Sequence, residues 1–273
     1  MIAMEQQTPI SPQAWLERDT RQFNLWWQAT FLMLSLFAIT LLLWSIDTRQ
    51  LGNASVWAKP LKFESSLALY FITLALLAGY LPANIRMQAT WRSATYIAVA
   101  AGVFEVIYIF LQAARGRASH YNQETTVESA MYGLMGLGAL LLVAVSFYLG
   151  WLLYRDYQKQ KQDTFKLASA YGLMLGSVLT LITAGIMSSG QTHFAGTPAA
   201  DSWQVPVTGW LLSGGDLRIP HFFATHLMQF LPLYGLLLQR TTRNSADAQK
   251  NIVIFSIIYS SAVLIGLVAA FVY

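Results

Sequence analysis

Hydrophobic residues in this chain form seven long runs, each separated from the next by a polar stretch. Each run comes near the roughly 20 residues that an α-helix needs to cross a bilayer. The expected spans cover about 24–46, 62–81, 94–115, 130–153, 167–189, 221–239 and 251–272. The pattern predicts an all-α, polytopic membrane protein built as a bundle of seven transmembrane helices.

The segment before the first span is polar. Residues 1–22 hold both signs of charge, and Ser11 followed by Pro12 suits the N-cap and first position of a short helix at the membrane surface. Residues 23–273 are predicted to form a single transmembrane domain. Its longest loop, about 190–220, contains Trp203 and Trp210, which favour an interfacial lid or a short re-entrant element over a disordered segment.

Composition agrees with a membrane protein. The chain is 55% hydrophobic and 11% charged, whereas about 25% of residues in a soluble domain are charged. Cysteine is absent, which excludes disulfides, thiolate metal ligands and cysteine nucleophiles. The basic residues lie between apolar runs, so we expect membrane lipids, and not nucleic acids, as partners.

Lysine and arginine also predict the orientation. The N-terminal segment and the loops after the second, fourth and sixth spans carry more of them than the opposite side, with Arg155, Lys159, Lys161 and Lys166 in one loop. The positive-inside rule then places the N-terminus in the cytoplasm and the C-terminus outside. The predicted location is a bacterial inner (plasma) membrane, which the chain crosses several times.

Small residues recur at every fourth position on two predicted spans, and such faces let helix backbones approach closely. They are Ala94, Ala98 and Gly102 on the third span and Ala168, Gly172 and Gly176 on the fifth, while Gly133, Gly136 and Gly138 reduce the side-chain bulk of the fourth. We interpret them as packing faces, either within the chain or between the protomers of a homodimer.

All four histidines fall on the predicted outer side of the membrane. His120 follows the third span, His193 follows the fifth, and His221 and His226 open the sixth. The last two are five residues apart, about 140° around a helix, so they do not form the i, i+4 metal pair of an HExxH helix. His226 is the deepest of the four and the strongest candidate metal ligand.

Glu105 lies near the middle of the third span. An ionisable group at that depth costs roughly 2.5–3.5 kcal/mol or more unless it faces protein or water. We therefore expect Glu105 to face the bundle interior, together with Gln112 on the same helix face. Either a neutral side chain that is hydrogen-bonded across helices or a functional acid satisfies this expectation.

Further candidates lie at the outer membrane edge. Glu128 and Asp216 join Glu105 as candidate catalytic carboxylates, although Glu128 also suits the start of the fourth helix. Eight side chains offer charge or hydrogen bonds to a lipid or an anionic small molecule. These ligand-binding candidates are Lys59, Lys62, Gln112, Arg115, Ser119, Asn122, Arg218 and Gln229.

The first functional hypothesis is a metal-dependent, membrane-embedded enzyme of hydrolase type that acts on a lipid or other apolar substrate. His226 and two of the other histidines would bind Zn²⁺, and one candidate carboxylate would activate a metal-bound water. Seven spans with histidines and acids at one membrane face resemble the seven-span ceramidase and adiponectin-receptor-like hydrolases. The paired histidines that those families carry late in the chain are absent here, since the seventh span has no histidine.

Two alternatives remain. A transporter or small-ligand receptor would use Glu105 as an intramembrane proton site, although an odd span number without an inverted repeat counts against a transporter. A b-type haem protein would need two axial histidines, and only His226 lies well inside a span.

Overall fold

The computed structural model is all-helical apart from one short hairpin. It describes residues 12–52, 54–161, 163–190, 192–197, 203–205, 208–242 and 244–272, with side chains from Asn24 onward except at position 160. The elements within these residues are α1 (Pro12–Ile46), β1 (Gln50–Leu51), β2 (Ala54–Ser55), α2 (Ala58–Ala78), α3 (Ala83–Arg86), α4 (Ala89–Ala114), α5 (Thr126–Gln160), α6 (Thr164–Gly190), α7 (Arg218–Thr241) and α8 (Ser245–Ala269).

Each predicted span falls on one of the long helices. Within the described chain, six helices are long and apolar enough to cross a membrane: α1 from Asn24, α2, α4, α5, α6 and α8. The all-helical, multi-pass character is therefore confirmed. The remaining long helix, α7, has 24 residues but does not belong to this group, because His221, His226 and Gln229 lower its hydropathy.

The first helix begins at Pro12, as the sequence predicts, but it continues without interruption to Ile46. The expected separate surface helix is therefore the first part of α1. Ser11 and the segment before it lie outside the described residues.

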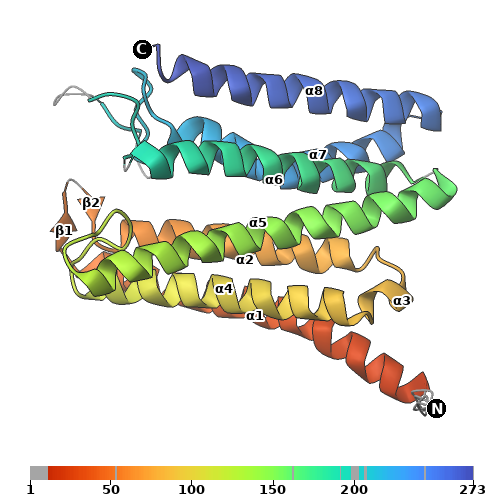
Figure 1. The fold of residues 1–273 in the computed structure, drawn as a ribbon, viewed down its shortest axis with the longest axis horizontal. Helices are drawn as coiled ribbons and strands as arrows, with labels where there is room; N and C mark the ends of the chain where they lie inside the picture. The colour runs from red at the N-terminus through yellow and green to blue at the C-terminus, as the bar shows by residue number, and fades with distance from the viewer. Residues whose placement is uncertain are drawn as a thin grey trace, which may run out of the picture.

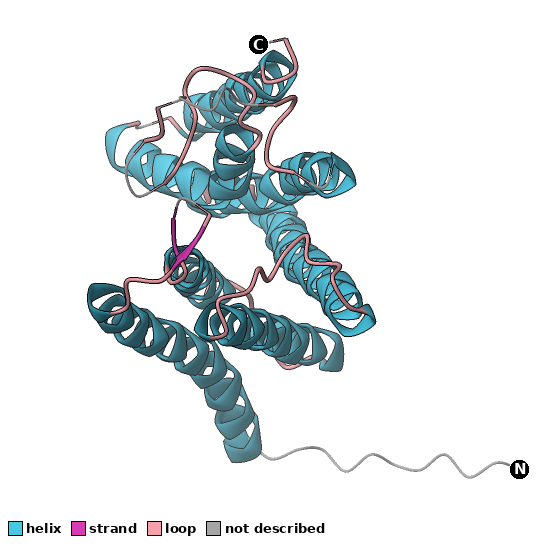
Figure 2. Cartoon of the chain, turned by 90° about the vertical axis from the view of Figure 1, so that its left-hand side faces the viewer, coloured by secondary structure: helices cyan, strands magenta, loops and turns pink. Residues whose placement is uncertain are grey.

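The long helices form two three-helix units that α5 connects (Figures 1 and 2). In the first unit, α1, α2 and α4 pack together, and the ring of Trp26 lies 6.1 Å from Phe71 and 6.2 Å from Trp91. In the second unit, α6, α7 and α8 pack around a core that includes the fully buried Leu227 and Ile252. The connecting helix α5 packs against both α4 and α6.

The glycines predicted to lie on packing faces occupy two different environments. A Cβ atom at Gly172 would lie 2.9 Å from the Leu227 carbonyl oxygen, so this glycine permits the close approach of α6 and α7. Gly133 and Gly136 on α5 have no atom within 4 Å of that position. The predicted packing role is therefore confirmed for α6, whereas these two α5 glycines face open space.

Strands β1 and β2, the loop 115–125 and the described residues between α6 and α7 (192–197, 203–205 and 208–217) gather at one end of the bundle, which we call the loop end (Figure 1). Arg49 helps to hold it together, because its guanidinium bonds Asp47 at 2.7 Å and donates to the Ala114 carbonyl at the end of α4 at 3.0 Å. Helix α1 begins at the opposite end of the bundle, and α8 ends at the loop end.

Candidate functional site

Three ionisable side chains meet at the loop end of the first helical unit. Lys59 lies in the first turn of α2, Glu105 lies on α4, and His120 lies in the loop after α4. Glu105 is only 5% exposed, and its Oε1 atom is 4.0 Å from His120 Nε2. Lys59 and Glu105 interact electrostatically, yet neither has a hydrogen-bond partner in the described part of the chain. We call this group the Lys59–Glu105–His120 centre.

Aromatic rings surround the imidazole of this centre. The His120 ring lies 5.3 Å from Phe63 and 6.0 Å from Tyr132. Tyr121 continues the series, since its ring lies 5.5 Å from Tyr132 and 5.2 Å from His193. The rings therefore connect the first helical unit to the loop that precedes α7.

Both loop histidines are held neutral by their surroundings. Burial lowers the pKa of His120 to about 3, and the nearby Lys59 and His193 contribute in the same direction. Burial also lowers the pKa of His193 to about 4, with a further contribution from Arg218. At neutral pH the His120–Glu105 contact is therefore between an uncharged imidazole and the carboxyl group.

These pKa values predict that the fold is sensitive to acid. Between the ordinary pKa of 6.5 and the folded value of about 3, the unfolded chain binds a proton at His120 that the folded chain does not, so stability decreases as the pH falls. Acidification from about pH 7 to about pH 5 should cost about 2 kcal/mol at His120. Thermal unfolding followed by tryptophan fluorescence should show a smaller decrease in midpoint for His120→Gln. An equal decrease in both proteins would contradict the assignment.

A second polar cluster stabilises the loop between α4 and α5. Thr125 is the N-cap of α5: its hydroxyl accepts from the Glu128 amide at 3.2 Å and donates to the Glu128 carboxylate at 3.1 Å. Arg117 pairs with the same carboxylate at 2.7 Å, and Gln112 donates to the Ala118 carbonyl at 3.2 Å. The Glu128 carboxylate is therefore held by Thr125, the N-cap of its own helix, and by Arg117 of the loop.

Other predicted ligand residues complete this cluster. Arg115 donates to the Gln112 side chain at 3.0 Å, and Asn122 donates to the Ala118 carbonyl at 2.9 Å. Ser119 differs from them, because its hydroxyl lies 3.2 Å from His120 Nδ1. It therefore supports the Lys59–Glu105–His120 centre.

A third cluster organises the start of α7. The Asp216 side chain is fully buried and pairs with Arg218 at 2.6 Å. Arg218 also donates to the Gly209 carbonyl, and Lys62 of α2 donates to the Thr208 carbonyl at 2.7 Å. These contacts bring Lys62, Asp216 and Arg218 to one loop, as side chains that fix its conformation.

The two histidines of α7 point to different partners. His221 Nδ1 lies 2.9 Å from the Thr183 hydroxyl on α6. His226 Nδ1 lies 3.2 Å from the Gln229 oxygen, and Gln229 donates to the Thr73 hydroxyl on α2 at 3.0 Å. The last contact joins α7 to the first helical unit.

The predicted zinc site is not supported. Among the described residues, no group of three or more histidine, aspartate or glutamate side chains could hold a metal ion. The physical reason is that the histidine rings have other neighbours: His193 packs on the Tyr121 ring, and His221 and His226 bond to Thr183 and Gln229. The described residues therefore give no support to the metal-dependent hydrolase hypothesis, and these contacts include no facing histidine pair for the haem hypothesis.

Sequence reasoning did not include several residues that shape the site. Phe63 is four residues after Lys59 and thus on the same face of α2, so its place beside the centre was predictable. Tyr121 adjoins His120 in the sequence. Thr73 and Thr183 had no such signal, because their contacts with Gln229 and His221 depend on how α2 and α6 pack.

Comparisons with protein-family models, with curated proteins and with solved structures found no match for this chain. The geometry of the site is therefore the basis for assigning a function.

Proposed function

We propose that this chain is a multi-pass carrier or receptor of the bacterial inner membrane, with a loop-end site that binds a small organic anion. Glu105 is the proton-exchanging group of this site. The proposal is supported by the Lys59–Glu105–His120 centre, in which a cation and a buried acid have no hydrogen-bond partner in the described chain. Because buried charges are normally paired and hydrogen-bonded, such a centre is suited to a ligand that supplies the missing contacts.

In this proposal α7 is the sixth of seven spans, and α8 is the last. Its apolar residues Ala224, Leu227, Leu231 and Leu238 are buried in the core shared with α6 and α8, so neighbouring helices can shield its polar residues from lipid. With seven spans, the lysine and arginine distribution favours an N-terminus in the cytoplasm. The loop end and the C-terminus then face the periplasm.

The chemistry of the centre couples anion binding to proton binding. The Lys59 ammonium attracts an anion. A protonated Glu105 can donate a hydrogen bond to that anion, whereas an ionised Glu105 repels it. His120, which is 4.0 Å from Glu105, lies in the loop at the membrane edge and is placed to pass protons to Glu105.

The two-unit architecture is compatible with a carrier despite the odd helix number. Movement of one three-helix unit relative to the other would occur around α5. Two hydrogen bonds between α2 and the second unit would have to break, namely Lys62 to Thr208 and Gln229 to Thr73.

Thermal unfolding with acetate or succinate tests the proposal. A ligand at 100 times its dissociation constant should raise the free energy of unfolding by about 2.7 kcal/mol. We expect stabilisation of the wild type that is stronger at about pH 5 than at about pH 7. Lys59→Met should lose it. Glu105→Gln, which mimics the protonated acid, should keep it and lose the pH dependence.

Lys62→Met is the matched control, since this exposed lysine lies near Lys59 on the same helix and bonds a loop carbonyl. Its response to the anions should equal that of the wild type. Equal stabilisation of wild type and Lys59→Met would contradict anion binding at the centre. A pH dependence that persists in Glu105→Gln would contradict the role of Glu105.

A further inference from the structure

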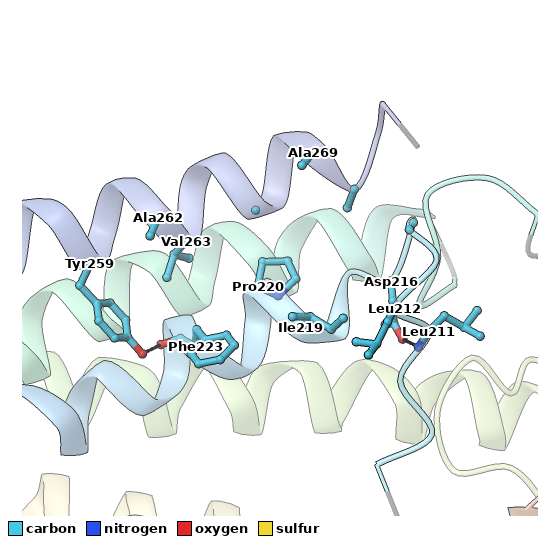
Figure 3. Close-up of a pocket in the computed structure, with 14 residues that line it drawn as sticks. Leu211, Leu212, Asp216, Ile219, Pro220, Phe223, Tyr259, Ala262, Val263 and Ala269 are labelled. Carbon is cyan, nitrogen blue, oxygen red and sulfur yellow. Dashed lines mark hydrogen bonds between the residues drawn. The ribbon is translucent and has the colours of Figure 1, made fainter. Parts of the chain in front are cut away.

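A cavity of about 540 Å³ lies between α7 and α8 near the loop end, and the 211–216 turn closes part of it (Figure 3). Its wall on α8 extends from Tyr259 to Ala270. At 1.5 Å per helical residue this is a length of roughly 16 Å. The cavity is therefore elongated along the helices, which suits a chain-like occupant.

Small residues make the space between the helices. Gly266 lines the cavity, and no atom lies within 4 Å of the position that a Cβ atom there would take. This contrasts with the α6–α7 interface, where Gly172 and Gly235 lie in close contact with the facing helix. The small side chains of α8 therefore leave a gap next to α7.

The polar side chains in the cavity wall already have hydrogen-bond or ion-pair partners within the protein. Tyr259 donates its hydroxyl proton to the Phe223 carbonyl at 3.0 Å (Figure 3). Asp216 accepts from the Leu211 amide at 2.9 Å and pairs with Arg218. The other lining residues are apolar or glycine, as Ile219 and Phe223 illustrate. Ordered water needs two to four polar partners in a cavity, so this space favours hydrocarbon.

The neighbouring surface of α8 faces the same kind of environment. This helix is apolar enough to cross a membrane, and its exposed side chains include Leu264, Ile265 and Val268. Lipid chains are therefore next to the cavity and can enter it without losing contact with hydrocarbon.

We propose that this cavity binds a hydrocarbon chain of a membrane phospholipid. The bound chain fills the space below the 211–216 turn and supports the turn that carries Asp216. The inference is independent of the anion site, because none of the residues of the Lys59–Glu105–His120 centre lines the cavity.

Photolabelling tests the proposal. The full chain is reconstituted in phosphatidylcholine vesicles that contain a trace of phosphatidylcholine with a diazirine at the end of one acyl chain, and labelled peptides are mapped after illumination. Besides label on the lipid-facing side chains of α8, we expect label on the buried cavity residues Val263 and Ala270. Gly266→Leu should lose most of the label on these two residues, because its side chain fills the cavity.

Gly136→Leu is the matched control, since this exposed glycine on α5 also has open space around it but does not line the cavity. It should keep wild-type labelling of Val263 and Ala270. Equal labelling of these two residues in Gly266→Leu, or no label on them in the wild type, would overturn the proposal. Unfolding midpoints verify that the variants fold, and Ala262→Phe replaces Gly266→Leu if that variant does not.

Discussion

Replacement of Asp216 by alanine is expected to lower the free energy of unfolding by about 3–5 kcal/mol. The buried carboxylate accepts hydrogen bonds from the Leu211 amide at 2.9 Å, from the Arg218 amide at 3.0 Å and from the Arg218 guanidinium at 2.8 and 2.6 Å. Alanine would leave a partly buried guanidinium without its counter-charge and a buried amide without an acceptor. Chemical denaturation in detergent micelles measures the loss.

Glu124→Ala is the control for this prediction. Glu124 pairs with Arg117 at 3.3 Å, but its side chain is 68% exposed, and exposed ion pairs contribute about 0–1 kcal/mol. Asp216→Ala should also increase chymotrypsin cleavage at Trp210, since the turn loses its anchor. A variant as stable and as protease-resistant as the wild type would show that Asp216 does not organise the loop.

Replacement of Gly235 by alanine is expected to cost about 1–3 kcal/mol through overpacking. A Cβ atom at this position on α7 would lie 2.4 Å from the Ala168 Cβ on α6, so the two helices would have to separate. The same denaturation experiment measures the effect. Gly133→Ala on α5 has open space around it and should be neutral or gain about 0.5–1 kcal/mol from its lower backbone entropy.

A rescue variant identifies the cause of the Gly235→Ala effect. Ala168→Gly removes the atom that the new methyl group would meet, so the double variant should recover much of the lost stability. Equal destabilisation of the single and double variants would mean that the α6–α7 contact at these two positions is not the limiting one.

The apolar runs alone were sufficient to predict the helices. Hydrocarbon requires long helices with satisfied backbone hydrogen bonds, so a run such as 130–153 has only one stable form and lies within α5. Helical spacing likewise predicted that Gly172 lies on a packing face, although only the structure shows that α7 is the helix it contacts. The short hairpin 50–55 and α3 had no such signal, because brief elements depend on local turns.

The gathering of polar residues at one end of the bundle followed from topology, since residues near alternate span ends must lie on one side. The distances between these polar residues could not be predicted from the topology. Whether His120 approaches His193 or Glu105 depends on the packing of α4 against the loop after α6. Tertiary structure decided that the acid lies 4.0 Å from His120, while His193 packs on the Tyr121 ring.

Amino-acid order thus determined the all-helical, membrane-spanning class, because hydrophobicity and helical period are local properties of the chain. Tertiary structure decided which polar side chains satisfy one another. Glu128 and Asp216, predicted as catalytic carboxylates, are engaged by Thr125 and Arg218, whereas Glu105 has no hydrogen-bond partner in the described chain. The physical reason is that a carboxylate's role depends on the donors within about 3 Å of it, and these come from residues distant in sequence as well as from neighbours.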